Sequence, residues 1–391
     1  MPNPGCRSTV GPVSPLPENH EPFRIAVTDD ELADLRHRLR RTRWSGFIEG
    51  AGWRYGTDPE YLRELVAYWS ETFDWRREER RLNAFPHFRS VVDGLRVHYI
   101  HRKADGGGLP VLVLHGWPGS FVQMLDLLPL LAAPAEHGGV PADAFDVVVG
   151  SLPGFGFSEA SAAPGMTETR MARVFHELMS RVLGYERYAV RGSDFGASVA
   201  EALAARYPEA VVGIHLSGTT PRADNPPVDP GPEIRRYIDD VARWRSAEVG
   251  YGAIQATKPQ SLAASLNDSP AGLAAWIVEK FRRWSDCGGV VERRFTKDQL
   301  LTNISVYWFT QSIGSSMRLY CESDYRQDAE WRVPTAHLMS SKDMFPTPRE
   351  WVERFSRVDR WTAVERGGHF IEWEEPLLVA EDMRAFFRSL R

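Results

Sequence analysis

Tyr188-Ala-Val-Arg-Gly-Ser-Asp-Phe-Gly-Ala-Ser-Val-Ala200 is the stretch that decides the fold. An apolar strand leads into a sharp turn flanked by Gly192 and Gly196, and a run of small residues then predicts a helix. This strand–turn–helix context is typical of a nucleophile elbow, a motif usually written G-x-S-x-G. The middle position, which normally holds serine, holds Asp194 in this chain.

The aspartate changes the chemistry that this position predicts. A serine must lose a proton before it attacks, and it suits acyl carbons. A carboxylate is already ionised at neutral pH and can displace a leaving group at a saturated carbon, which leaves an alkyl ester on the protein. Asp194 therefore favours the opening of an epoxide or an alkyl halide over ester hydrolysis. The alternative is a turn aspartate that accepts hydrogen bonds from nearby backbone amides.

Strands and helices alternate around this motif. Apolar strands are predicted at 111–114, 147–150 and 189–190, and helices at 121–132, 168–183 and 196–206. Residues 88–100 resemble a hairpin that turns at Asp93-Gly94. The alternation predicts a doubly wound, mostly parallel α/β sheet, in which the reactive loops lie at the carboxyl ends of the strands.

The pattern divides the chain into four parts. Residues 1–88 form a mostly helical N-terminal extension, and residues 89–221 form the first part of the α/β core. Several prolines break the pattern near residue 221, after which 222–325 read as a helical cap inserted into the core. An apolar strand at 333–339 resumes the sheet pattern, so 326–391 form the second part of the core.

The N-terminal extension has two local signals. Thr28 precedes a helix and is followed three residues later by Glu31, which predicts a capping box. The extension also carries many aromatic residues, which we expect to pack against a neighbouring part of the chain. They are Trp44, Trp53, Tyr61, Tyr68, Trp69, Phe73 and Trp75.

Composition excludes several classes of function. The 391 residues are 43% hydrophobic and 25% charged, with a net charge of −5, as in ordinary globular proteins without a basic surface for nucleic acid. Cys6, Cys287 and Cys321 are far apart and lack the spacing of metal ligands. We therefore expect no metal and a reduced, cytoplasmic setting. No apolar run approaches the roughly 20 residues that a membrane span needs.

Two further residues could complete a catalytic set with Asp194. His369 follows two glycines, which permit a tight loop that presents the imidazole as a base. Asp343 follows the strand at 333–339, where a carboxylate would orient His369. Nucleophile, acid and histidine then occur in the order that this kind of fold uses. Three carboxylates compete with Asp343, namely Glu365, Glu372 and Glu374.

Catalysis of epoxide opening through an ester also needs two kinds of hydrogen-bond donor, one for the oxyanion and one for the departing epoxide oxygen. His115-Gly-Trp-Pro-Gly-Ser120 could aim a backbone amide at a developing oxyanion, with the amide of Phe195 as its companion. Epoxide opening also needs a donor for the departing oxygen, and a tyrosine hydroxyl can serve. The predicted cap offers four tyrosines, among which the pattern alone does not choose: Tyr237, Tyr251, Tyr307 and Tyr320.

With these residues the chain resembles the microsomal-type epoxide hydrolases of the α/β-hydrolase superfamily, from about residue 23 to the end. Residues 115–120 and 192–196 match the oxyanion and nucleophile motifs, although tryptophan often follows the nucleophile where this chain has Phe195. Gly367-Gly-His-Phe370 matches the histidine motif. Further matches lie in the N-terminal extension and the cap, at 68–76, 82–88, 250–259, 267–276 and 318–320.

The resemblance implies an α/β-hydrolase fold and a cofactor-free epoxide hydrolase that converts an epoxide and water to a vicinal diol. It implies that Tyr251 and Tyr320 bind the epoxide oxygen while Asp194 attacks a ring carbon and forms an ester.

For the second step, the resemblance implies that His369, oriented by Asp343, activates a water that attacks the ester. The backbone amides of Trp117 and Phe195 then hold the oxyanion.

The resemblance also bears on setting and substrate. Mammalian members begin with a membrane anchor that this chain lacks, so we expect a soluble cytoplasmic protein. The arginine-rich, lysine-poor composition is typical of a GC-rich bacterial gene, and soluble bacterial relatives include enzymes of natural-product pathways such as enediyne biosynthesis. We therefore expect an aryl or natural-product epoxide, in secondary metabolism or antibiotic biosynthesis. Oligomeric state is left open, with a homodimer as one candidate.

Two alternatives stay open. A haloalkane dehalogenase shares the aspartate nucleophile and needs halide-binding donors, usually tryptophan, a part that Trp117 could take. A non-catalytic binding protein with the α/β-hydrolase fold would bind a small molecule without turnover. The complete set of nucleophile, acid and base favours an enzyme.

Overall fold

The computed structural model describes residues 20–219, 227–324 and 330–391. Cys6 and the rest of the proline-rich start lie outside the described residues, as do the prolines at 221 and 226. None of the described helices combines the length and the apolar character that a membrane span requires.

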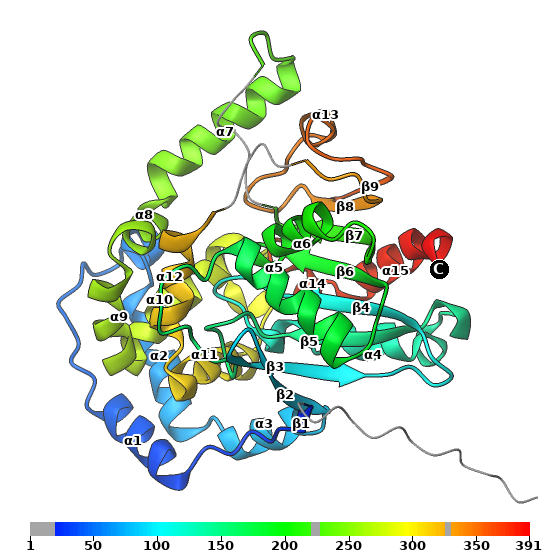
Figure 1. Ribbon diagram of the computed structural model, residues 1–391. Helices are drawn as coiled ribbons and strands as arrows, with labels where there is room; N and C mark the ends of the chain where they lie inside the picture. Colours follow the sequence, from blue (N-terminus) through cyan, green and yellow to red (C-terminus); the bar gives the residue numbers. More distant parts are fainter. Residues whose placement is uncertain (1–19, 220–226, 325–329) are drawn as a thin grey trace, which may run out of the picture.

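A sheet of nine strands, in the order β1-β2-β3-β5-β4-β6-β7-β8-β9, forms the centre of the described molecule (Figure 1). The strands are β1 (Glu21–Pro22), β2 (His87–Val92), β3 (Leu95–Arg102), β4 (Leu109–Leu114), β5 (Phe145–Gly150), β6 (Tyr188–Ser193), β7 (Val211–Ser217), β8 (Thr335–Ser340) and β9 (Arg360–Val364). β1, β2, β3 and β5 pair antiparallel in succession, and every pair from β5 to β9 is parallel. The predicted mostly parallel sheet is thus confirmed.

The hairpin between β2 and β3 turns at the predicted residues. Asp93 and Gly94 have φ angles of 50° and 77°, and Val92 pairs directly with Leu95. A two-residue turn with both φ angles positive has the twist that antiparallel strands require, and Asp-Gly is among the sequences that adopt it at least cost.

Helices cover both faces of the sheet. α5 (Glu168–Glu177) and α6 (Phe195–Arg206) pack together on one face, and α4 (Leu127–Ala132) and α15 (Pro376–Phe387) pack together on the other (Figure 1). The short helices α13 (Arg349–Val352) and α14 (Ile371–Glu374) lie between β8 and α15 along the chain.

The helix predicted over 121–132 is divided. A 3₁₀ turn spans Phe121–Met124, and α4 begins only at Leu127. Pro129 accounts for the division, because proline is tolerated in the first turn of a helix but not in its interior. The helix predicted over 168–183 likewise ends its regular α-helical part at Glu177 and closes with a π-helical turn.

Between β7 and β8 the described residues form helices and no strand. These helices, called the cap from here on, are α7 (Pro232–Glu248), α8 (Gly250–Thr257), α9 (Pro259–Asp268), α10 (Pro270–Trp284), α11 (Lys297–Thr310) and α12 (Ile313–Glu322). Figure 1 shows α8 to α12 gathered beside the sheet, while α7 projects away from it. Since the insertion follows β7, it lies at the carboxyl end of the parallel strands.

The N-terminal helices α1 (Asp29–Arg40), α2 (Pro59–Glu71) and α3 (Trp75–Leu82) pack against this cap. The Tyr68 hydroxyl donates to Asp298 Oδ1 at 3.0 Å, and the rings of Trp75 and Phe309 lie 4.8 Å apart between centroids. The aromatic residues of the extension were predicted to pack against a neighbouring part of the chain, and these contacts with the cap agree with that prediction. Trp44 is an exception, because its side chain is 41% exposed. The capping box that begins α1 at Thr28 is present as predicted.

Candidate active site

The nucleophile elbow has the geometry that its sequence predicts. Asp194 lies between β6 and α6 with φ 53° and ψ −125°, a conformation that costs energy in any residue other than glycine. Its backbone amide donates to the Gly218 carbonyl at 3.0 Å. A Cβ atom on Gly192 would lie 2.2 Å from the Gly196 carbonyl oxygen, so β6 and α6 can approach this closely only with glycine. The elbow thus presents the Asp194 carboxylate at the carboxyl end of β6.

The two carboxylate oxygens of Asp194 have different partners. Oδ1 accepts a hydrogen bond from the backbone amide of Trp117 at 2.8 Å, and Oδ2 lies 3.3 Å from His369 Nε2. The loop that carries Trp117 reaches the carboxylate because a Cβ atom on Gly116 would lie only 2.3 Å from the Asp194 side chain. The structure therefore brings the predicted donor, nucleophile and base together.

His369 is held from its other side by Asp343. Its Nδ1 lies 3.0 Å from Asp343 Oδ1, and the same oxygen accepts a bond from the backbone amide of Met344 at 2.6 Å. His369 is only 4% exposed, so its orientation depends on these contacts. The bond to Asp343 fixes which ring nitrogen faces Asp194.

The competing carboxylates have other contacts. Glu365 is exposed, and Glu372 forms a fully buried ion pair with Arg191. Glu374 of α14 accepts a hydrogen bond from the backbone amide of Asp286 at 2.8 Å, which ties α14 to the segment that follows α10. Among the carboxylates that the sequence left in competition, Asp343 is the one that contacts the imidazole.

The electrostatics of His369 reflect its two neighbours. Burial lowers its pKa, because an apolar environment disfavours the charged form. The carboxylates of Asp343 and Asp194 outweigh burial and raise the pKa from 6.5 to about 10. A pKa this high keeps the imidazole protonated at neutral pH.

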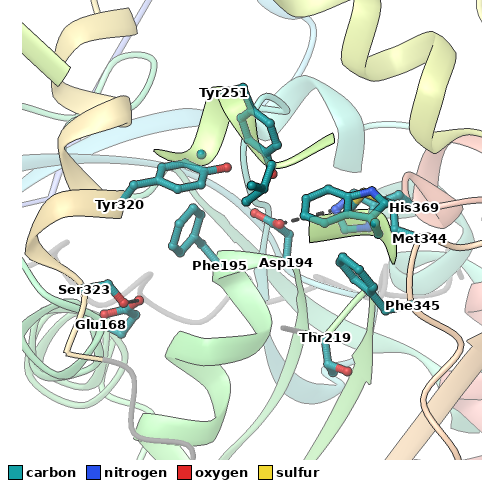
Figure 2. Close-up of a pocket in the computed structure, with 14 residues that line it drawn as sticks. Glu168, Asp194, Phe195, Thr219, Tyr251, Tyr320, Ser323, Met344, Phe345 and His369 are labelled. Carbon is teal, nitrogen blue, oxygen red and sulfur yellow. Dashed lines mark hydrogen bonds and ion pairs between the residues drawn. The ribbon is translucent and has the colours of Figure 1, made fainter. Parts of the chain in front are cut away.

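Two of the four cap tyrosines face the nucleophile. Tyr251 of α8 and Tyr320 of α12 line the same cavity as Asp194, and Figure 2 shows both side chains directed towards the carboxylate. Their ring centroids are 5.9 Å apart at 82°. The Trp117 ring supports both, since it stacks on Tyr251 at 5.6 Å and meets Tyr320 edge-on at 5.7 Å.

The other two tyrosines have structural contacts. The Tyr307 hydroxyl donates to the Gly119 carbonyl at 2.6 Å, so it holds the loop after β4 against α11. Tyr237 packs beside Trp351 in a separate hydrophobic cluster. Of the four tyrosines among which the sequence pattern did not choose, Tyr251 and Tyr320 are the two that line the cavity with Asp194.

The predicted second oxyanion donor, Phe195, begins α6 directly after Asp194. Its ring lines the cavity and meets Tyr320 edge-on with centroids 4.8 Å apart. The role of its backbone amide stays a prediction.

Comparison with known proteins gives the family. Residues 20–124 match the family model described as epoxide hydrolase N terminus, and residues 110–277 match that of the alpha/beta hydrolase fold. The chain is 34% identical to epoxide hydrolase 1 of Sus scrofa, over 99% of this chain and 92% of the relative. It belongs to the epoxide hydrolase family.

Further relatives agree with this assignment. A provisionally named epoxide hydrolase of Stigmatella aurantiaca is 40% identical, over 95% of this chain and 85% of the relative. Among solved structures, the juvenile hormone epoxide hydrolase of the silkworm Bombyx mori superimposes with a TM-score of 0.87 at 32% identity, covering 95% of each chain. The predicted α/β-hydrolase fold is thereby confirmed.

The cavity of this epoxide hydrolase has a volume of about 300 Å³. Several of its lining residues were not found from sequence: Glu168, Trp244, Val249, Met344, Phe345 and Ser323. Met344 and Phe345 directly follow Asp343, and that adjacency was the available signal. Val249 and Ser323 lie within three residues of Tyr251 and Tyr320, whereas Glu168 and Trp244 are outside the catalytic motifs, so only the fold brings these two to the site.

Burial also sets the protonation of the two cavity tyrosines. It raises the pKa of Tyr251, and the nearby Asp194 carboxylate raises it further. Burial raises the pKa of Tyr320 well above its usual value, with added contributions from Tyr251 and Asp194. Both phenols are therefore protonated at neutral pH and can act as donors.

Proposed function

We propose that this epoxide hydrolase opens its substrate in two steps through an ester on Asp194, giving a vicinal diol. The observation that supports the proposal most strongly is the arrangement around one cavity. The Asp194 carboxylate contacts His369 at 3.3 Å, while the hydroxyls of Tyr251 and Tyr320 face the same cavity. An epoxide between them has a nucleophile on one side and two acids on the other.

In the first step a carboxylate oxygen of Asp194 bonds to one ring carbon, and the bond from that carbon to the epoxide oxygen breaks. The oxygen becomes an alkoxide, which takes a proton from Tyr251 or Tyr320. Because the two phenols are buried and protonated, their hydrogen bonds are strongest when negative charge develops on the oxygen. They therefore stabilise the transition state more than the bound substrate.

Ester formation prepares the second step. It removes the charge of Asp194, which is one of the two carboxylates that raise the pKa of His369. The imidazolium then gives up a proton, which restores the tyrosine, and the neutral ring becomes a base. It deprotonates a water, and the hydroxide attacks the carboxyl carbon of Asp194. The Trp117 amide, already bonded to Oδ1, holds the oxyanion, with the Phe195 amide as second donor. The bond from the carboxyl carbon to the diol oxygen then breaks, and that oxygen takes the proton of the new carboxyl group. Asp194 returns to a carboxylate, His369 keeps the proton that it took from water, and the diol leaves.

This charge coupling makes a prediction about His369. In Asp194→Asn the carboxylate that helps to raise the pKa of His369 is absent, so the pKa falls below that of the unmodified protein. Titration of the imidazole by NMR with labelled histidine measures the difference. A neighbouring change that keeps both carboxylates, such as Ser193→Ala, leaves the pKa where it is. An unchanged pKa in Asp194→Asn would contradict the mechanism.

The paired tyrosines make a second prediction. A hydrogen bond to a charged group contributes about 1.5–3 kcal/mol, so Tyr251→Phe or Tyr320→Phe should each lower kcat/KM for diol formation about 10- to 100-fold. The double variant should lose about 10³-fold or more, because no phenol remains to protonate the alkoxide. Tyr237→Phe, outside the cavity, serves as control. A double variant with full activity would remove both tyrosines from the mechanism.

We also propose an aryl epoxide as the substrate class. The cavity walls include Phe195, Trp244 and Phe345, and flat aromatic faces favour an aromatic substituent. A natural-product epoxide and a place in secondary metabolism stay predictions from the sequence.

The test of the proposed function is turnover of a panel of racemic aryl epoxides, styrene oxide included, with chiral analysis of the diols. We expect diol formation, with a handedness that reports which ring carbon Asp194 attacks. Repeated turnover in ¹⁸O-labelled water should also place the label in Asp194. Folded protein that binds these epoxides without turnover would instead support a binding protein.

One observation favours a second candidate, a haloalkane dehalogenase. The indole Nε1 of Trp117 is buried without a hydrogen-bond partner in the part of the chain that is described, and such a donor can bind a halide. The cavity lining does not include Trp117, however. Chloride or bromide release from 1-haloalkanes at a rate comparable to epoxide turnover would favour this candidate.

A further inference from the structure

Glu168 and Ser323 form a second polar site in the cavity wall, separate from the catalytic residues. Glu168 is the first residue of α5 in the core, and Ser323 follows α12 in the cap. Both line the cavity. Figure 2 shows them side by side, apart from Asp194 and His369 and on the side of Phe195.

The carboxylate of Glu168 is buried but has spare capacity as an acceptor. It is only 2% exposed. Its Oε1 accepts from Ser323 Oγ at 2.5 Å and its Oε2 accepts from the Asp324 amide at 3.0 Å. The backbone amide of Glu168 also interacts with the carboxylate. Since a carboxylate can accept about four hydrogen bonds, one further donor can still bind. Burial raises its pKa to about 7, which means that a further donor would stabilise the ionised form.

A clamp between core and cap does not by itself explain this residue. The same two segments are already joined by the Met166 amide, which donates to Glu322 Oε2 at 2.9 Å, and by the Thr169 amide, which donates to Asp324 Oδ1 at 3.2 Å. None of these four residues lines the cavity. Glu168 differs from them because it faces the substrate space, where a buried carboxylate is costly unless it has partners.

We propose that the Glu168–Ser323 pair recognises a hydrogen-bond donor, namely a hydroxyl group, on the epoxide substrate. The inference rests on the proposed function and narrows its substrate class to hydroxylated epoxides. The reactive ring lies at Asp194 while the hydroxyl donates to Glu168. Ser323 holds the carboxylate in place, so it is a positioning residue.

The test uses three matched series of 1,2-epoxyalkanes that end in a hydroxyl, a methyl ether or a methyl group, each at several chain lengths. At a pH above 7, where Glu168 is mostly ionised, we expect the hydroxyl series of the unmodified protein to exceed the methyl series in kcat/KM by about 10-fold at one chain length, since a hydrogen bond to a charged acceptor is strong. The methyl ether accepts hydrogen bonds but cannot donate them, so its kcat/KM should equal that of the methyl series. A methyl ether preferred as strongly as the hydroxyl would overturn the proposal.

Variants separate recognition from structure. Glu168→Leu should abolish the hydroxyl preference, measured as the ratio of kcat/KM between the hydroxyl and methyl series, and thermal denaturation checks its folding. Glu168→Gln keeps the shape of the side chain and replaces the leucine variant in the test if that variant does not fold. It should lower the hydroxyl preference about 3-fold through loss of charge. Glu177→Leu, at the far end of α5 and outside the cavity, should keep the preference.

Two results would overturn the inference in different ways. If Glu168→Leu lowers kcat/KM of all three series equally, Glu168 is only a clamp between core and cap. If neither the three series nor styrene oxide yields a diol with the unmodified protein, the proposed function itself fails. The two results can be told apart. If Glu168 is only a clamp, the unmodified protein still converts the methyl series to diols.

Discussion

Asp194→Asn is expected to lower the rate of diol formation by about 10⁴-fold or more. The amide oxygen is a far weaker nucleophile than a carboxylate, so the ester cannot form, although the side chain keeps its size. The hydrogen bond from the Trp117 amide to Oδ1, which is 2.8 Å long in the unmodified protein, can persist to the amide oxygen. Substrate binding should therefore survive while the first chemical step is lost. Single-turnover measurement with styrene oxide gives the rate of that step.

The control for this variant is Ser193→Ala, one residue earlier. Ser193 is buried at the end of β6, and its hydroxyl has no hydrogen-bond partner among the described residues. The alanine variant should keep its activity, which shows that the elbow tolerates substitution. Intact-mass measurement before the assay checks that the asparagine has not hydrolysed to aspartate. Diol formation by intact Asp194→Asn within 10-fold of the unmodified protein would mean that Asp194 is not the nucleophile.

Local rules in the sequence account for most of the fold. The turn at Asp93-Gly94 and the start of α1 at Thr28 depend on residues within four positions of each other, and both occur as predicted. The division of α4 from the preceding 3₁₀ turn was missed, although Pro129 was a signal for it. The parallel sheet could be predicted because β4 and β5 contain short apolar runs, Val111–Leu114 and Val147–Val149, that suit burial on both faces.

The site could be predicted only in part, because its walls come from distant segments. The elbow and the histidine loop are local motifs, and their residues meet as predicted. The sequence pattern could not tell Tyr251 from Tyr307, since both lie on apolar cap helices. Only the fold shows that the Tyr307 hydroxyl is bonded to Gly119. Glu168 gave no local signal, because its place in the cavity depends on how the cap meets α5.

His369→Gln is expected to lower kcat by about 10²–10⁴-fold while leaving the first step fast enough to observe. Glutamine can still donate a hydrogen bond but cannot accept a proton from water, so the ester forms and then persists. One equivalent of substrate should be consumed rapidly, followed by slow turnover. Intact-mass analysis should show Asp194 carrying the mass of one substrate molecule, and peptide mapping locates the adduct.

The same experiment separates the base from the residue that orients it. Asp343→Asn keeps the imidazole but removes one of the carboxylates that raise its pKa, so the adduct should accumulate to a smaller extent than in His369→Gln. Glu365→Gln, an exposed change in the same loop, should accumulate none. If His369→Gln consumes substrate slowly without an adduct, the histidine acts before or during ring opening. In that case the protonated imidazole of His369 would act in the first step rather than the second, and the proposed order of proton transfers would be wrong.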